Sequence, residues 1–147
     1  MKRILASIVT ICVAAPAFAQ DASGDPEAGE KVFRKCKACH SIETADGEAI
    51  QKGGQVGPNL WGVTQRQPGS LEGFSYGEDL VAAGETMPDG WTEEEFVAYV
   101  QNPRDWLSEK LDGSGRSKMT FVLRDEEEAK DVWAYLASVG PDAAATN

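Results

Sequence analysis

Two cysteines and the chain's only histidine stand within five residues, in the stretch RKCKACHSIE at positions 34–43. Cys36 and Cys39 are spaced C-x-x-C, and His40 follows them directly. Thiolate sulfur and imidazole nitrogen are ligands for soft and borderline metals. Because the other 142 residues hold no further histidine and only one more cysteine, the clustering predicts a metal, cofactor or redox site here.

The first 19 residues, MKRILASIVTICVAAPAFA, have the three parts of a secretory signal peptide. Lys2 and Arg3 are followed by a short apolar run, and Ala17 and Ala19 form an A-x-A cleavage pattern. The apolar run is too short to span a membrane, although an uncleaved weak anchor is the alternative. We expect cleavage after Ala19 and export, which removes Cys12 with the signal.

Three kinds of chemistry compete for the remaining pair of thiols. A thioredoxin-like redox pair requires a βαβ setting, and no strand is evident before Cys36. A zinc site requires about four ligands, of which the mature chain offers three plus a carboxylate. Covalent haem attachment requires only C-x-x-C-H, in which the thiols add to the haem vinyl groups and the histidine binds the iron. The spacing and the export signal favour one covalent haem c through Cys36 and Cys39, with His40 as iron ligand.

The elements that must position this motif are helices joined by long loops. Asp25 is an N-cap candidate with Pro26 at the first helical position, and the apolar spacing up to Cys36 predicts a helix that carries the motif at its end. A long glycine-rich loop follows at 46–63, and YGEDLVAAG predicts a short helix that ends near Gly84.

Three more helices follow in the second half of the chain. Thr92 and Glu95 form a capping box, Asn102–Pro103 ends that helix and starts another, and Asp125 caps the last one. The segment 112–121 between them is a loop, and no strand pair is convincing. The sequence therefore predicts one all-α domain over residues 20–139, followed by a flexible tail at 140–147.

A bound haem iron requires a sixth ligand or an open position. No second histidine exists, and the mature chain keeps two methionines, Met87 and Met119. Met119 lies in a loop behind the flexible lead GSGRSK, whereas Met87 directly precedes Pro88, where the backbone is stiffer. Either methionine could instead fill a gap in the core. We favour Met119 as the ligand.

The segments CKACH, GPNLWGV, GFSYGE, AYVQNP, SKMTF and VWAYL together resemble class I c-type cytochromes. They are most similar to the bacterial periplasmic cytochrome c2 family of alphaproteobacteria, from about Asp25 to Val139. The resemblance implies a helical fold in which the first and last helices cross, with Gly29 and Phe33 against the last helix. Two departures are Gly77–Leu80, where the family often has Asn or Thr, and a longer loop before Met119 than in mitochondrial relatives.

The resemblance also implies a role for each residue around the haem. His40 and Met119 would be the axial ligands, and Pro58 would offer its carbonyl oxygen to the His40 ring. Three further residues, Arg66, Tyr76 and Trp91, would bind the haem propionates. Tyr99 would contact the Met119 sulfur, and Phe121 would cover the haem edge.

The distribution of charged residues indicates which classes of partner the protein can bind. Without Lys2 and Arg3 the chain has 12 basic and 24 acidic residues, a net charge of −12, which disfavours nucleic acid and anionic lipid. Seven of the basic residues fall in the two windows 34–40 and 110–124, which also hold the expected axial ligands. We expect these windows to form a basic ring at the haem edge, with ordinary solvated charge as the equal alternative.

The expected function is that of a soluble periplasmic electron carrier rather than an enzyme, because an iron with both axial positions filled offers no site for a substrate. The resemblance implies a cytochrome bc complex as donor, a terminal oxidase or photosynthetic reaction centre as acceptor, and a monomer. The alternatives are a haem enzyme or gas sensor with an open sixth position, and a donor to a dedicated periplasmic reductase.

Overall fold

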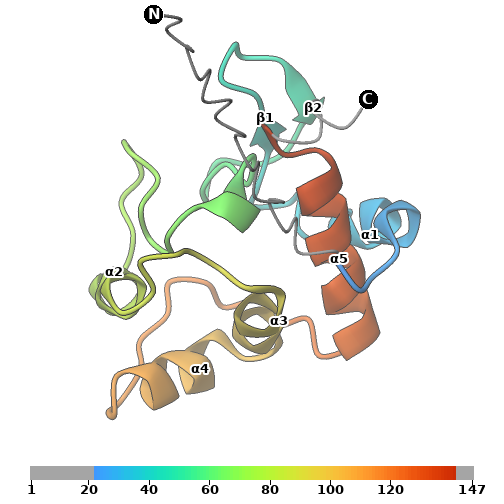
Figure 1. Ribbon diagram of the computed structural model, residues 1–147. Helices are drawn as coiled ribbons and strands as arrows, with labels where there is room; N and C mark the ends of the chain where they lie inside the picture. Colours follow the sequence, from blue (N-terminus) through green and yellow to red (C-terminus); the bar gives the residue numbers. More distant parts are fainter. Residues whose placement is uncertain (1–21, 142–147) are drawn as a thin grey trace, which may run out of the picture.

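The computed structural model describes residues 22–141, so the predicted signal peptide and most of the predicted tail lie outside the described residues. Five α-helices dominate this part of the chain (Figure 1). Their bounds are α1 Pro26–Phe33, α2 Glu78–Glu85, α3 Glu93–Gln101, α4 Pro103–Lys110 and α5 Glu126–Ser138, with a 3-10 turn η1 at Val63–Gln65. The predicted all-α fold is thereby confirmed. None of these helices is long and apolar enough to cross a membrane.

Four of the five helices begin where the sequence predicted, three of them at the predicted caps Asp25, Thr92 and Asp125 and one at the Asn102–Pro103 boundary. The side chains of Asp25, Thr92, Asn102 and Asp125 accept hydrogen bonds from backbone N–H groups in the first turns of α1, α3, α4 and α5. These bonds satisfy donors that a helix start leaves without a partner. The predicted capping box is only half formed, because the Glu95 carboxylate accepts a bond from the Trp106 indole at 2.7 Å and pairs with Lys110 instead.

A short strand pair was missed from the sequence. Strands β1 (Ile42–Glu43) and β2 (Ala49–Gln51) pair antiparallel with an irregular register. They form a small projection beside one end of α5 in Figure 1. Gln51, at the end of β2, donates a hydrogen bond to the Tyr135 hydroxyl at 3.0 Å, so this projection is tied to α5.

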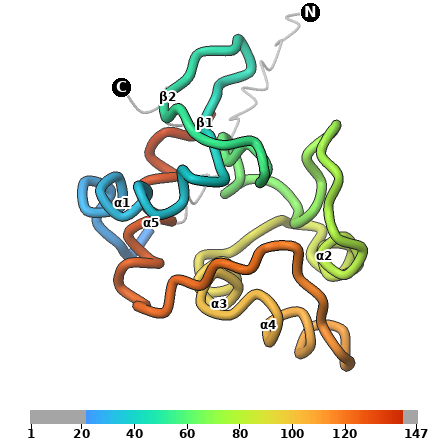
Figure 2. Tube along the Cα trace, turned by 180° about the vertical axis from the view of Figure 1, so that it is seen from behind, coloured from blue at the N-terminus to red at the C-terminus, as the bar shows by residue number. Residues whose placement is uncertain are grey.

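The first and last helices cross in close contact, as the resemblance implied, and both views show α1 beside α5 (Figures 1 and 2). Gly29 makes this approach possible, since an added Cβ would lie 1.9 Å from the backbone oxygen of Asp131. The rings of Phe33 and Tyr135 pack at 5.7 Å between centroids. Phe33, Val132 and Leu136 are almost wholly buried in the core.

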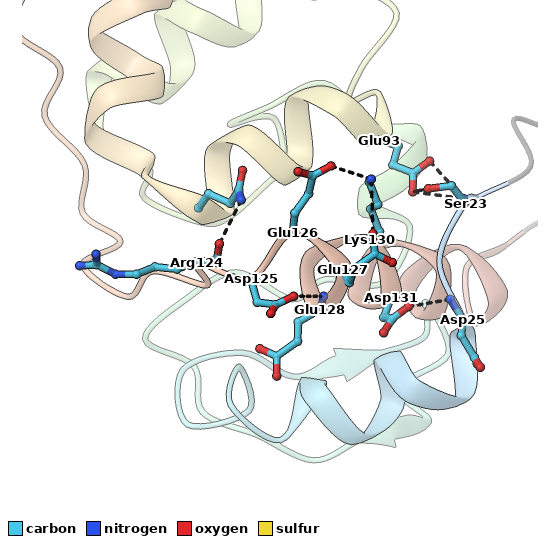
Figure 3. A network of polar contacts seen from close by, with 11 residues as sticks. Ser23, Asp25, Glu93, Arg124, Asp125, Glu126, Glu127, Glu128, Lys130 and Asp131 are labelled. Carbon is cyan, nitrogen blue, oxygen red and sulfur yellow. Dashed lines mark hydrogen bonds and ion pairs between the residues drawn. The ribbon is translucent and has the colours of Figure 1, made fainter.

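Polar contacts fasten the beginning of the fold to α3 and α5 (Figure 3). The hydroxyl of Ser23 donates to Glu93 at 2.7 Å, and the Asp25 backbone N–H donates to Asp131 at 2.7 Å. Lys130 pairs with Glu126 at 2.6 Å on the same surface. The helical frame around α1 and α5 is thus tied together both by its apolar interior and at its surface.

Candidate haem site

One cavity of about 570 Å³ brings the predicted site residues together. Its lining includes all ten of them: Cys36, Cys39, His40, Pro58, Arg66, Tyr76, Trp91, Tyr99, Met119 and Phe121. They come from segments spread over 86 positions of the chain, between Cys36 and Phe121. Apolar groups make up most of the lining, as a site for a large flat macrocycle requires.

The two thiols and the imidazole come from the attachment segment, residues 34–40, which directly follows α1. The predicted helix ends before the motif, at Phe33, and turns continue the chain. In these turns the backbone N–H groups of Cys36 and His40 donate to Phe33 and Cys36 at 2.8 and 3.0 Å. Short-range backbone bonds therefore fix the spacing of the two cysteines and the histidine.

Burial shifts the pKa of two donors in this segment, Cys36 and His40. It raises the pKa of the Cys36 thiol to about 11, against a smaller opposing effect of the nearby Lys35 charge. It lowers the pKa of His40, while the hydrogen bond to the Pro58 carbonyl acts in the opposite direction. The imidazole is therefore neutral at pH 7, which is the form that coordinates metals.

The His40 ring is oriented by its neighbours on the glycine-rich loop. Nδ1 lies 2.8 Å from the carbonyl oxygen of Pro58. Because a carbonyl only accepts, Nδ1 carries the proton and Nε2 keeps a lone pair for a metal. Gly57 packs on the ring so closely that an added Cβ would lie 2.3 Å from Cε1. Sequence reasoning left Gly57 without a role, because the packing becomes apparent only when the loop is placed on the motif.

Met119 lies in the methionine loop, residues 111–121, between α4 and α5. Its backbone N–H donates to the Ser117 hydroxyl at 3.1 Å. The Tyr99 hydroxyl, predicted to lie at the Met119 sulfur, is close to the Ser117 side chain. Burial raises the pKa of Tyr99 more than this contact lowers it. Ser117 is a site residue that the sequence analysis missed.

The other candidate ligand, Met87, is half-buried against the core and is absent from the cavity lining. Its backbone N–H donates to Gly84 at 2.8 Å in the turn that ends α2. This placement agrees with the alternative role of a methionine that fills a gap in the core.

Arg66, Tyr76 and Trp91 contribute polar groups to the cavity lining, which also holds Lys35, Arg116 and Lys118. The Arg66 guanidinium donates to the carbonyl oxygens of Trp61 at 2.7 Å and Asn59 at 2.5 Å. Burial lowers the pKa of Arg66 and raises that of Tyr76, while the contact between the two side chains opposes both shifts. The indole of Trp91 packs against Tyr99 and Trp106 at centroid distances of 5.2 and 5.3 Å. These donors fit anionic groups at an otherwise apolar site.

Two apolar side chains of the cavity lining are exposed to solvent. Phe121 is 39% exposed, and Val56 on the glycine-rich loop is 81% exposed. Val56 was another residue without a predicted role. A large exposed side chain beside a cavity gives an approaching partner an apolar contact.

The arrangement fits a covalent haem better than the other two chemistries. Two thiols, a neutral imidazole with one nitrogen available, a thioether and a polar group of Arg and Tyr all line one apolar cavity. Within residues 22–141, no group of three or more His, Cys, Asp or Glu side chains is placed to hold a metal ion, as a zinc site would require.

Comparison with known proteins decides the family. The sequence model of the family described as Cytochrome c matches residues 26–140, which is most of the chain. This chain belongs to the cytochrome c family. Its cofactor is accordingly one covalent haem c, and its role is that of an electron carrier.

The similar proteins are cytochromes of alphaproteobacteria. Cytochrome c-551 of Roseobacter denitrificans is 51% identical over 141 residues, which are 95% of this chain and 96% of that protein. Cytochrome c-550 of Paracoccus versutus is 45% identical over 144 residues, which are 97% and 91% of the two chains. The X-ray structure of cytochrome c2 from Paracoccus denitrificans superposes with a TM-score of 0.76 at 46% identity, covering 82% of this chain and 99% of that one.

Proposed function

We propose that this protein is a periplasmic electron carrier in which the iron of one haem c is bound by His40 and Met119. The observation that carries the proposal is that an imidazole with a protonated Nδ1 and a loop thioether line the same cavity as the C-x-x-C thiols. When bound, the haem supplies one iron that changes between Fe(II) and Fe(III).

The chain's own residues have distinct tasks in this proposal. Cys36 and Cys39 hold the cofactor through thioether bonds, and the Pro58 carbonyl keeps the His40 ring in the orientation that presents Nε2. Met119 would supply the second protein ligand to the iron and would keep small molecules from binding it. With Met119 bound, the protein would act as a carrier and not as an enzyme or gas sensor. A thioether ligand also raises the reduction potential.

Arg66, Tyr76 and Trp91 are proposed to bind the haem propionates. Anionic carboxylates are costly to bury without partners, and these three residues bring a cation and polar hydrogens to the cavity lining. Arg66 contacts the Tyr76 side chain, and its carbonyl oxygen accepts the Trp91 backbone N–H at 3.3 Å. Arg66 already satisfies two backbone carbonyls, so its guanidinium is held in place before the propionate is bound.

Ion pairs engage some of the basic residues of the expected ring and leave others available to a partner. Lys35 pairs with Glu128 at 2.6 Å, Lys110 pairs with Glu95, and Arg116 lies 3.6 Å from Asp79. Among residues 22–141, four members of the two windows make no ion pair: Arg34, Lys37, Lys118 and Arg124. Lys118 shares the cavity lining with the exposed Val56 and Phe121, and the Lys37 carbonyl accepts the Gly54 N–H of the loop that carries Val56. We propose that Lys37 and Lys118 meet an acidic partner.

Those partners are proposed to be a cytochrome bc complex as donor and a terminal oxidase or photosynthetic reaction centre as acceptor. Electrostatic attraction brings them together, so the reaction slows as salt screens the charges. The protein is exported as a precursor and works as a monomer. The mass of the purified holoprotein tests the export step, since cleavage leaves a chain that begins at Gln20 with one haem attached.

The experiment that tests the function uses the reduced holoprotein. Mixed with oxidase-containing bacterial membranes, it should be oxidised rapidly, with a rate that falls as ionic strength rises. The same reduced protein, exposed to carbon monoxide, should keep its spectrum because Met119 occupies the iron. Slow oxidation together with ready carbon monoxide binding would favour the haem enzyme or gas sensor.

A further inference from the structure

The second residue of α2 makes an unusual contact with a distant loop. One carboxylate oxygen of Asp79, Oδ2, accepts the backbone N–H of Arg116 at 2.7 Å. The other, Oδ1, lies 3.6 Å from Nη2 of the same arginine. Only 16% of the Asp79 side chain is exposed, so the carboxylate is held between α2 and the loop rather than solvated.

Arg116 stands three residues before Met119, in the middle of the methionine loop. The loop contains no helix or strand that could fix it, and Figure 2 shows it as a long strip that passes α2 and returns across α3 to α5. Its position therefore depends on individual bonds. Near Met119 these include Gly115 N–H to Ser108 Oγ at 2.7 Å and Lys118 Nζ to the Ser75 carbonyl at 2.9 Å.

The Asp79 contact differs from the other two in kind. An ionised carboxylate that accepts a backbone N–H makes a charge-assisted bond, which is stronger than the bond of the Gly115 N–H to the neutral Ser108 hydroxyl. It also acts on the backbone of the loop, whereas Lys118 is attached through a long flexible side chain. Glu78 next to it serves as a contrast, since its side chain is 95% exposed and lies 4.0 Å from Arg116.

We propose that Asp79 is a positioning residue for the sixth iron ligand. Its carboxylate fixes the backbone of the loop at Arg116, and this keeps the Met119 thioether at the cavity. The inference rests on the proposed function, because it requires Met119 to be the ligand. Asp79 is not part of the cavity lining, so it acts by reducing how often the loop moves away.

Competition with imidazole tests this role. Imidazole binds ferric iron only when the thioether has left, so its apparent affinity reports how easily the loop opens. The ferric holoprotein is titrated with imidazole while the weak near-infrared absorption of the sulfur–iron bond is followed. Asp79→Ala should bind imidazole about tenfold more tightly than the wild type, corresponding to the loss of one charge-assisted bond.

Two further variants separate the parts of the contact. Asp79→Asn keeps an oxygen that can accept the Arg116 N–H and should change the affinity by only about threefold. Glu78→Gln removes a neighbouring charge without touching the loop backbone and should bind imidazole as the wild type does. Denaturant unfolding of each variant, followed by circular dichroism, shows whether the rest of the fold has changed.

The outcomes distinguish this inference from the proposed function. Wild-type imidazole affinity in both Asp79 variants overturns the positioning role while Met119 ligation stands. A fall in global stability that accounts for the whole change in imidazole affinity also overturns it, since Asp79 would then be merely structural. If the wild type lacks the sulfur–iron band, the proposed ligand is wrong and the inference fails with it.

Discussion

The attachment segment and the methionine loop line the same cavity, but the chain holds them in place by different means. The attachment segment follows α1 directly, is wound by short-range backbone bonds, and is braced where α1 crosses α5. The methionine loop has no helix or strand and is held by scattered hydrogen bonds to Asp79 of α2, to Ser108 of α4 and to Ser75 before α2. We therefore expect the histidine side to be fixed by the fold itself and the methionine side to open while the rest remains folded.

The largest effect should come from the helix crossing. Gly29→Ala places a Cβ 1.9 Å from the Asp131 backbone oxygen, so α1 and α5 must separate. We expect the free energy of unfolding to fall by about 3 kcal/mol, since overpacking outweighs the gain of about 1 kcal/mol in helix propensity. Guanidinium titration of the variant and the wild type measures this change in the free energy of unfolding.

Gly113→Ala is the matched control in the methionine loop. The nearest atom to its added Cβ is the Leu111 oxygen at 3.6 Å, an ordinary contact. Its stability should stay within about 0.5 kcal/mol of the wild type. Equal losses in the two variants would mean that the crossing is no tighter than the loop.

A second prediction concerns the order in which the methionine loop and the helices unfold. In guanidinium, the sulfur–iron band of the ferric protein should disappear at a lower concentration than the helical circular dichroism signal. The reason is that a few bonds hold the loop, whereas burial and crossing hold the helices. A single shared midpoint for the two signals would show that the regions unfold together.

The smallest effect concerns the basic residues of the attachment segment. Lys35 is engaged by Glu128, while Lys37 has no ion pair among the described residues. At low salt, Lys37→Gln should slow oxidation by the acceptor roughly twofold, the scale of one screened surface charge, and Lys35→Gln should slow it less. Stopped-flow mixing with oxidase-containing membranes measures both rates. A larger loss from Lys35→Gln would show that its ion pair opens for the partner.

Local sequence rules predicted the parts of the fold that depend on neighbouring residues. Asp25, Thr92 and Asp125 were identified as caps, and Asn102–Pro103 as a helix boundary, because each of these caps bonds within three residues of itself. The strand pair at 42–51 was missed because it is too short to show alternation. The end of α1 was placed too late, since the turns that follow it keep helix-like spacing as far as His40.

The residue types in the sequence were enough to predict the part of the site that carries the cysteines and the histidine. The C-x-x-C-H motif and the scarcity of histidine pointed to the attachment segment, and family resemblance supplied the rest of the lining. Gly57, Ser117 and Asp79 were not assigned roles, because their contacts depend on how distant segments meet. The Asp79–Arg116 contact joins residues 37 positions apart, and no local pattern encodes it.

The most direct test of the central claim is the near-infrared spectrum of the ferric holoprotein in the wild type, Met119→Ala and Met87→Ala. The wild type should show the weak band of a sulfur–iron bond. Met119→Ala should lose it and become open to cyanide, while Met87→Ala should keep it. A band that survives Met119→Ala but is lost in Met87→Ala would show that Met87, and not Met119, is the ligand. A wild type without the band that binds carbon monoxide readily when reduced would contradict the closed electron carrier.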